Sequence, residues 1–91
     1  MLIEYAKSFD KSIKKLKDKV ALTQLKDLIN ELKAANSLRE ICNVVPIKNY
    51  PERYRIRTGD FRLVVRYIDG EISILIIEYL RRNEKTYRNY N

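Results

Sequence analysis

The apolar residues of this chain change their spacing once, between a lysine-rich N-terminal part and a segment that begins after Pro51. Before the change they recur every three or four positions, which is typical of helices with one buried stripe. After it they alternate with charged residues, which is typical of strands with one buried face. Because 91 residues can enclose only one small core, we expect residues 1–91 to form a single domain with helices first and strands after.

Two helices are predicted in the N-terminal part, and Ser8 is a suitable cap for the first. The apolar stripe of this helix consists of Phe9, Ile13, Leu16 and Val20. The segment 17–19 predicts a break, and Asn36 predicts the end of a second helix. The stripe of the second helix consists of Leu22, Leu25, Leu28, Ile29 and Leu32. Together they form an αα-hairpin whose lysines either cover a solvated face, which we favour, or contact nucleic acid.

An edge strand and a hairpin are predicted in the middle of the chain. Residues 44–47 are expected at a sheet edge, because Pro46 cannot donate a ladder hydrogen bond. Segments 54–57 and 61–67 both alternate, and Thr58-Gly59-Asp60 between them is a turn signal. These two segments should therefore pair as antiparallel strands.

Asp69-Gly70 is the strongest hairpin signal in the chain, because a two-residue type I′ turn needs residues that tolerate positive φ. It predicts a tight connection to a last strand over residues 72–79. That segment is apolar on both faces, as expected of a strand in the interior of a sheet.

The two kinds of basic residue are separated along the chain: the nine arginines all follow residue 38, whereas eight lysines precede it. If the turn at 58–60 aligns the apolar faces of its strands, several arginines share one polar face. These are Arg53, Arg55, Arg57, Arg62 and Arg66. Like charges on neighbouring strands repel, and a guanidinium group binds phosphate through two hydrogen bonds. We interpret this face as a phosphate-binding surface or as one that neutralises an acidic protein partner.

The chain has no histidine, one cysteine and a formal net charge of +7. These counts exclude a Ser-His-Asp or Cys-His apparatus, a two-histidine ribonuclease site and an internal disulfide, and they leave almost no zinc ligands. We therefore expect no metal and no cofactor. Cys42 is interpreted as a small buried hydrophobic residue in a reducing compartment. Since the N-terminus has no long apolar run, we expect a cytoplasmic protein that does not enter a membrane.

Two segments resemble the motifs of a known family. Residues 54–63, Tyr-Arg-Ile-Arg-Thr-Gly-Asp-Phe-Arg-Leu, resemble the YRIRxGDYR signature of the RelE/ParE toxin superfamily, and residues 79–88 are similar to its C-terminal HRxxxY or KRxxxxxY segment. The resemblance implies an α+β fold, in which the αα-hairpin packs on a mostly antiparallel sheet of about four strands. The implied order is β-α-α-β-β-β, with a first strand at residues 2–5.

The same resemblance implies roles for individual residues. Arg62 matches the arginine placed at the scissile phosphate, and Tyr87 matches the tyrosine that stacks on a base or assists proton transfer. Either Arg81 or Arg82 matches the basic residue before that tyrosine, where many relatives have a histidine. The residues expected to bind RNA are Lys48, Arg53, Arg55, Arg57, Arg66 and Arg88.

Many members of the superfamily are ribosome-dependent mRNA endonucleases that are paired with an antitoxin. The resemblance thus implies a type II toxin that cleaves mRNA by 2′-OH attack without a metal and inhibits translation. The general base stays open among Tyr87, Lys48 and Glu84. One alternative is a ParE-like inhibitor of DNA gyrase, and another is a degenerate relative that only binds its antitoxin. The implied partners are an acidic antitoxin, in a complex of higher order, and the ribosome with its mRNA.

Overall fold

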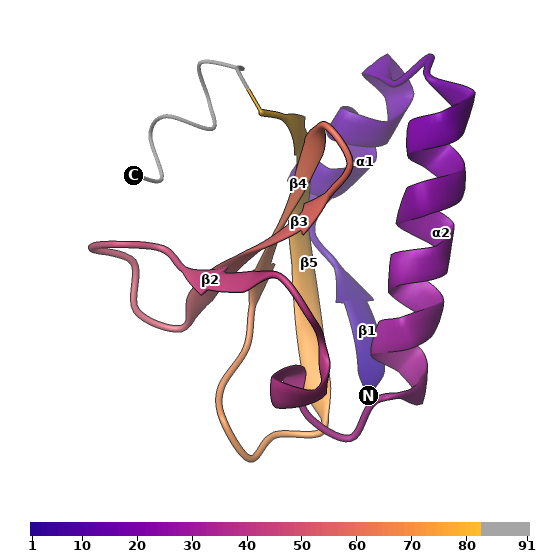
Figure 1. Ribbon diagram of the computed structural model, residues 1–91. Coiled ribbons are helices and arrows are strands. Elements are labelled where there is room, and N and C mark those ends of the chain that lie inside the picture. Colours follow the sequence, from indigo (N-terminus) through magenta and orange to yellow (C-terminus); the bar gives the residue numbers. More distant parts are fainter. Residues whose placement is uncertain (83–91) are drawn as a thin grey trace.

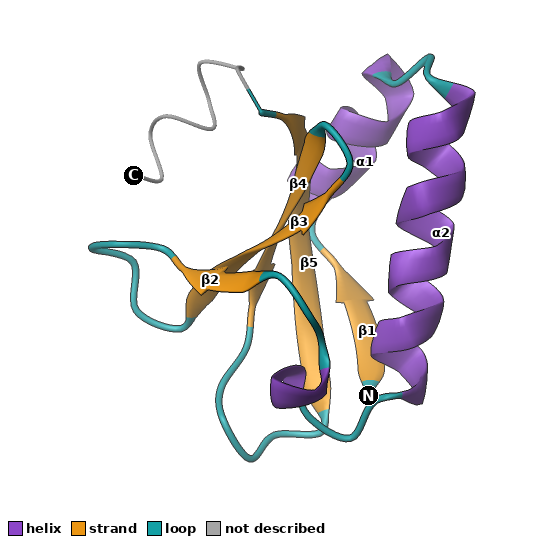
Figure 2. Ribbon diagram, in the orientation of Figure 1, coloured by secondary structure: helices purple, strands orange, loops and turns teal. Residues whose placement is uncertain are grey.

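The computed structural model describes residues 1–82 and shows two helices on one side of a curved sheet (Figures 1 and 2). The helices are α1 (Lys7–Lys15) and α2 (Lys19–Ala34), with a short 3₁₀ helix, η1 (Leu38–Glu40). The strands are β1 (Leu2–Tyr5), β2 (Val44–Pro46), β3 (Arg53–Thr58), β4 (Phe61–Arg66) and β5 (Ser73–Arg81). The predicted α+β class is therefore confirmed.

The strands form one sheet in the order β1-β5-β4-β3-β2. β1 runs parallel to β5, and every other neighbouring pair is antiparallel. The sheet has five strands rather than about four, because the segment around Pro46 does pair along the outer edge of β3. β5 lies between β1 and β4, which explains why it is apolar on both faces.

The predicted helix boundaries hold only in part. Asp18 is the N-cap of α2, and its carboxylate accepts a hydrogen bond from the Ala21 amide at 3.1 Å. Ser8 does not cap α1: it lies inside the helix, and its hydroxyl donates to the carbonyl of Ile77 at 2.6 Å. Val20 is 66% exposed, because the break between the helices changes the phase of the apolar stripe. α2 ends at Ala34, slightly before Asn36.

The prediction of a tight hairpin at Asp69-Gly70 is wrong. β4 ends at Arg66 and β5 begins at Ser73, so a longer loop joins them, and only Gly70 of the two turn residues has a positive φ. The amide of Tyr67 donates to the carbonyl of Glu52 at 2.8 Å, which extends the pairing of β4 with β3 beyond Arg66. The ladder with β5 ends at the pair of Arg66 with Leu75, and the ring of Tyr67 is buried in the core.

The core lies between the helices and the sheet. Leu25, Leu28 and Leu32 of α2 pack over Leu63 and other side chains of the central strands. Leu32 and Leu63 have no exposed surface. The buried sides of α2 and β4 are the apolar stripe and the alternating face that the sequence predicted.

Cys42 is exposed, which contradicts the expectation that it is buried. It lies in the irregular segment before β2, where Asn43 has a φ of 63°. An isolated cysteine carries no information about burial when its segment belongs to neither periodic pattern. Across residues 1–82, neither helix is long and apolar enough to cross a membrane.

We expect Leu32→Ala to lower the free energy of unfolding by about 2–5 kcal/mol, because it leaves a cavity under α2. Leu2→Ala is the matched control, since Leu2 is 63% exposed, and should change stability by no more than about 0.5 kcal/mol. Urea denaturation of both variants measures the difference. Equal losses in the two would mean that α2 does not pack on the sheet as described.

Candidate functional site

The candidate site is the face of β3 and β4 that points away from the helices. The two strands pair with Arg53 opposite Arg66, Arg55 opposite Val64 and Arg57 opposite Arg62. Directly opposed residues point to the same face, and the intervening Leu63 lies in the core against the helices. We call Arg53, Arg55, Arg57, Arg62 and Arg66 the arginine face. The alternation had predicted this juxtaposition.

The arginine face has an apolar strip beside it. Val64 of β4 and Ile77 of β5 form a small buried cluster with Ile47, and Leu75 packs against it. The cluster is separate from the core under the helices. A ligand on this face therefore meets guanidinium groups next to apolar side chains, which suits a polyanion with flat apolar groups, such as single-stranded nucleic acid.

Arg62 differs from the other arginines of this face because it is only 9% exposed. Its Nη1 donates to the carbonyl of Phe61 at 2.9 Å and to that of Gly59 at 3.5 Å. The guanidinium is thus held by the turn between β3 and β4. Such a fixed cation stabilises a developing negative charge without rearranging first.

The turn that holds Arg62 is closely packed against α2. Gly59 has a φ of 59°, which residues with a side chain rarely adopt. A Cβ atom at this position would lie 2.5 Å from Oε1 of Gln24. The Thr58-Gly59-Asp60 turn is therefore confirmed, and its glycine is required by both the backbone conformation and the nearby helix.

The outer arginines of the face are more accessible. Arg57 and Arg66 are exposed, whereas Arg53 and Arg55 are half-buried. Arg66 pairs with Glu52 at 3.4 Å, and the guanidinium carbon of Arg53 lies 5.8 Å from the centre of the Tyr50 ring. An exposed ion pair of this kind is weak, so Arg66 remains available to a phosphate.

The structure separates Arg81 from Arg62. Arg81 is opposite Phe61, and its guanidinium carbon lies 4.8 Å from the centre of that ring on the side of the helices. Arg62 is opposite Leu80 on the other side of the sheet. Arg82 follows β5, and its amide donates to the carbonyl of Asp60 at 2.9 Å.

The remaining predicted site residues are not gathered on the arginine face. Lys48 lies exposed in the loop between β2 and β3. Tyr87, Arg88 and the candidate base Glu84 lie outside the described residues. Within residues 1–82 there is no group of three or more cysteine, aspartate or glutamate side chains that is arranged to hold a metal ion.

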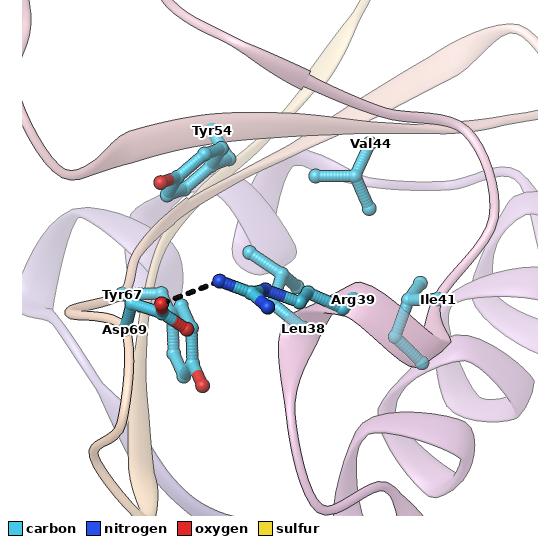
Figure 3. Close-up of a pocket in the computed structure, with 7 residues that line it drawn as sticks. All are labelled: Leu38, Arg39, Ile41, Val44, Tyr54, Tyr67 and Asp69. Carbon is cyan, nitrogen blue, oxygen red and sulfur yellow. Dashed lines mark hydrogen bonds and ion pairs between the residues drawn. The ribbon is translucent and has the colours of Figure 1, made fainter.

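The sequence did not predict a pocket of about 420 Å³ that lies between η1 and the side chains of Tyr54 and Tyr67 (Figure 3). Arg39 of η1 and Asp69 of the β4–β5 loop form an ion pair of 2.7 Å across it. The hydroxyl of Tyr67 is buried near this pocket without a hydrogen-bond partner in the described part of the chain. The pairing of Arg39 with Asp69 joins segments 30 residues apart, so no local signal could have revealed it.

Tyr79 supports the end of β5 nearest the site. Its ring stacks on Phe61 at a centroid distance of 4.8 Å, and its hydroxyl donates to the carbonyl of Ala21 at 3.0 Å. Burial raises the pKa of Tyr79 to about 12. This residue therefore connects α2 to the strand that carries Arg81.

Residues 3–86 match the family model of the ParE toxin of type II toxin–antitoxin systems. The chain belongs to the RelE/ParE toxin superfamily. Its fold is similar to that in the RelB–RelE antitoxin–toxin complex from Methanococcus jannaschii, with 26% identity and a TM-score of 0.77 over 97% of this chain and 99% of that one. No match was found among curated protein sequences.

More distant solved structures share the fold. The RelE–RelB complex from Pyrococcus horikoshii OT3 is 20% identical, with a TM-score of 0.69 over 91% of this chain and 96% of that one. YafQ from E. coli strain BL21(DE3) is 19% identical, with a TM-score of 0.57 over 88% of this chain and 91% of that one. This superfamily member is thus a type II toxin whose fold is similar to that of RelE toxins.

We expect the folded toxin to lose stability between pH 10 and pH 12 through Tyr79. The pKa of about 12 lies above the usual 10, so the unfolded state releases this proton first and gains stability as the pH rises. The loss attributable to Tyr79 is about 2 kcal/mol at pH 12. Tyr79→Phe should be less stable by about 1 kcal/mol at pH 7 and should lack this part of the decline.

Urea denaturation of both proteins at each pH gives the difference between the two profiles. Since the other tyrosines and the lysines titrate in both proteins, only the difference reports on Tyr79. Parallel profiles would show that the hydroxyl is not buried in the folded state.

Proposed function

We propose that this toxin is an endoribonuclease that cleaves mRNA on the ribosome and binds the RNA backbone on its arginine face. The observation that carries the proposal is the pairing of Arg57 with Arg62 beside three further arginines, with Arg62 buried and held in place. A cluster of like charges on adjacent strands is unfavourable, and a bound polyanion would relieve the repulsion.

Cleavage through the 2′-hydroxyl needs charge stabilisation more than it needs a metal. The 2′-hydroxyl gives its proton to a base while its oxygen attacks the neighbouring phosphorus, and the bond to the 5′-oxygen breaks. The leaving 5′-oxygen takes up a proton from the protonated base or from water, so that a cyclic phosphate and a free 5′-hydroxyl result. Negative charge develops on the phosphoryl oxygens during this step. The guanidinium of Arg62 and its neighbour Arg57 stabilise that charge, but they stay protonated and cannot accept the 2′ proton.

The proton acceptor is therefore another group. Tyr87, Lys48 and Glu84 are the candidates in this chain, and each would need a shifted pKa or the help of ribosomal RNA to act at neutral pH. The shift would be downward for Tyr87 and Lys48 and upward for Glu84. An enzyme with a weak base gains most from a substrate that is held in the reactive geometry. This consideration supports a dependence on the ribosome.

We expect Arg57→Gln and Arg62→Gln to lower the rate of mRNA cleavage by about 10²–10³ each, which is typical of the loss of one donor to a developing oxyanion. The measurement is cleavage of a reporter mRNA in a purified translation system. Arg39→Gln is the matched control, because Arg39 is exposed and pairs with Asp69 away from the arginine face. Circular dichroism checks folding, and Arg57→Gln is informative even if the buried Arg62 tolerates no change.

Unchanged cleavage in both arginine variants would refute the site. Tyr87→Phe, measured alongside them, tests the implied role of the C-terminal tyrosine. Absence of growth inhibition by the wild-type toxin, expressed without a partner, would instead support the degenerate relative that only binds its antitoxin.

Inhibition of DNA gyrase is the second candidate, because the matching family model is that of the ParE toxin. A gyrase supercoiling assay run beside the translation assay separates the two functions. The arginine face predicts cleavage of mRNA and unchanged supercoiling. The opposite result would assign this toxin to the gyrase inhibitors.

We also propose an acidic antitoxin as the protein partner, acting in the cytoplasm. The net charge of +7 and the two relatives that are complexes with a RelB antitoxin support this partner. If charge contributes to the complex, its dissociation constant should rise by at least about tenfold between 0.1 M and 0.5 M NaCl in calorimetric titrations. An affinity that does not depend on salt would place the antitoxin on an uncharged surface.

A further inference from the structure

A second cationic site lies on the helix side of the sheet, opposite the arginine face. It is a cavity of about 440 Å³ between the α1–α2 connection and the ends of β4 and β5. Its charged lining comes from Lys15, Lys17, Asp18 and Arg81, and its aromatic lining includes Phe61. The cleavage step proposed above uses Arg57 and Arg62, and neither lines this cavity.

The charges around the cavity are unbalanced. Three cations line it together with one acid, and the carboxylate of that acid, Asp18, already accepts a hydrogen bond from the Ala21 amide. Within residues 1–82, neither lysine nor Arg81 forms an ion pair with any carboxylate. The described part of the chain thus neutralises only part of the positive charge gathered here, since one carboxylate faces three cations.

Arg81 is held by an aromatic ring, and the N-terminal end of α2 lies beside the cavity. The guanidinium of Arg81 lies 4.8 Å from the centre of the Phe61 ring, which itself stacks on Tyr79. The 16-residue helix α2 begins at Lys19, directly after Asp18, and has no acidic residue in its first turn. The Asp18 carboxylate caps this end of the helix and offsets part of the positive potential of its dipole.

We propose that this cavity binds a phosphate group of the RNA backbone, at a point separate from the arginine face. Phe61 and Arg62 are consecutive residues of β4, so the two sites lie on opposite sides of the same strand end. An RNA strand that passes around the β3–β4 turn contacts both. The inference rests on the proposed function, because it takes RNA as the ligand.

The chemistry of the lining suits a phosphate group of the RNA backbone. A phosphate group in a nucleic acid presents several oxygens at one point, which suits one planar guanidinium and two mobile ammonium groups together. The volume of about 440 Å³ also leaves room for the sugar that adjoins the phosphate.

Titration of the full chain with inorganic phosphate, followed by amide NMR, tests the site directly. We expect saturable shifts at residues 17–21 and at Arg81, and their loss in the double variant Lys15→Gln/Lys17→Gln. The matched control is Lys7→Gln/Lys14→Gln, which removes the same charge from exposed positions of α1 outside the cavity. Non-saturable shifts, or equal losses in both double variants, would overturn the proposal.

Binding of a 2′-O-methyl oligoribonucleotide, which cannot be cleaved through 2′-OH attack, tests the ligand. The cavity variant should bind about tenfold more weakly, and the slope of log affinity against log salt should become less steep by about 0.7, the value for one lost phosphate contact. The control variant should bind with an affinity within about threefold of the wild type.

The remaining outcomes separate this proposal from the function on which it rests. Weakened binding of the antitoxin with unchanged binding of the oligonucleotide would make the cavity a carboxylate site and overturn the proposal. If Arg57→Gln cleaves normally while the cavity variant still loses phosphate and oligonucleotide binding, the proposed active site fails and the phosphate site stands. If Arg57→Gln loses cleavage while the cavity variant binds phosphate and the oligonucleotide like the wild type, the active site stands and the phosphate site fails.

Discussion

The pairing of β3 with β4 is the contact on which the rest of this structure depends. Its register sends Leu63 and Val65 toward the helices and Arg57 and Arg62 to the opposite face. A shift by one residue would bury arginines under α2 and expose the core, so the hydrophobic contacts of the helices also determine where the charge lies. The same interaction that stabilises the fold therefore assembles the candidate site.

The positive charge of this toxin is divided by the sheet between two sites of different character. On the open face, Arg62 is buried and held by carbonyl groups of its own turn, while Arg57 stays exposed beside it. On the helix side, Arg81 rests on Phe61 and shares a cavity with two lysines. The β3–β4 turn lies between them, and its packing against Gln24 connects α2 to both.

Much of the fold was predictable because it follows from local pattern. The stripe of α2, the turn at Gly59 and the arginines on one face all follow from the period of the side chains. The predictions failed where a distant partner decided the outcome. Ser8 donates to a carbonyl of β5 instead of capping α1, and the ladder between β4 and β5 ends at Arg66 and Leu75, too far from Gly70 for a tight hairpin.

The sequence by itself determined the α+β class, the excess of arginine in the C-terminal part and the lack of histidine, since these depend only on residue type and spacing. Only the tertiary structure decided that Arg81 lies on the other side of the sheet from Arg62, and that it joins Lys15 and Lys17 from a different part of the chain. The physical reason is that the spacing of residues determines only on which face of its strand a side chain lies. A cavity depends on which elements pack together in the folded chain.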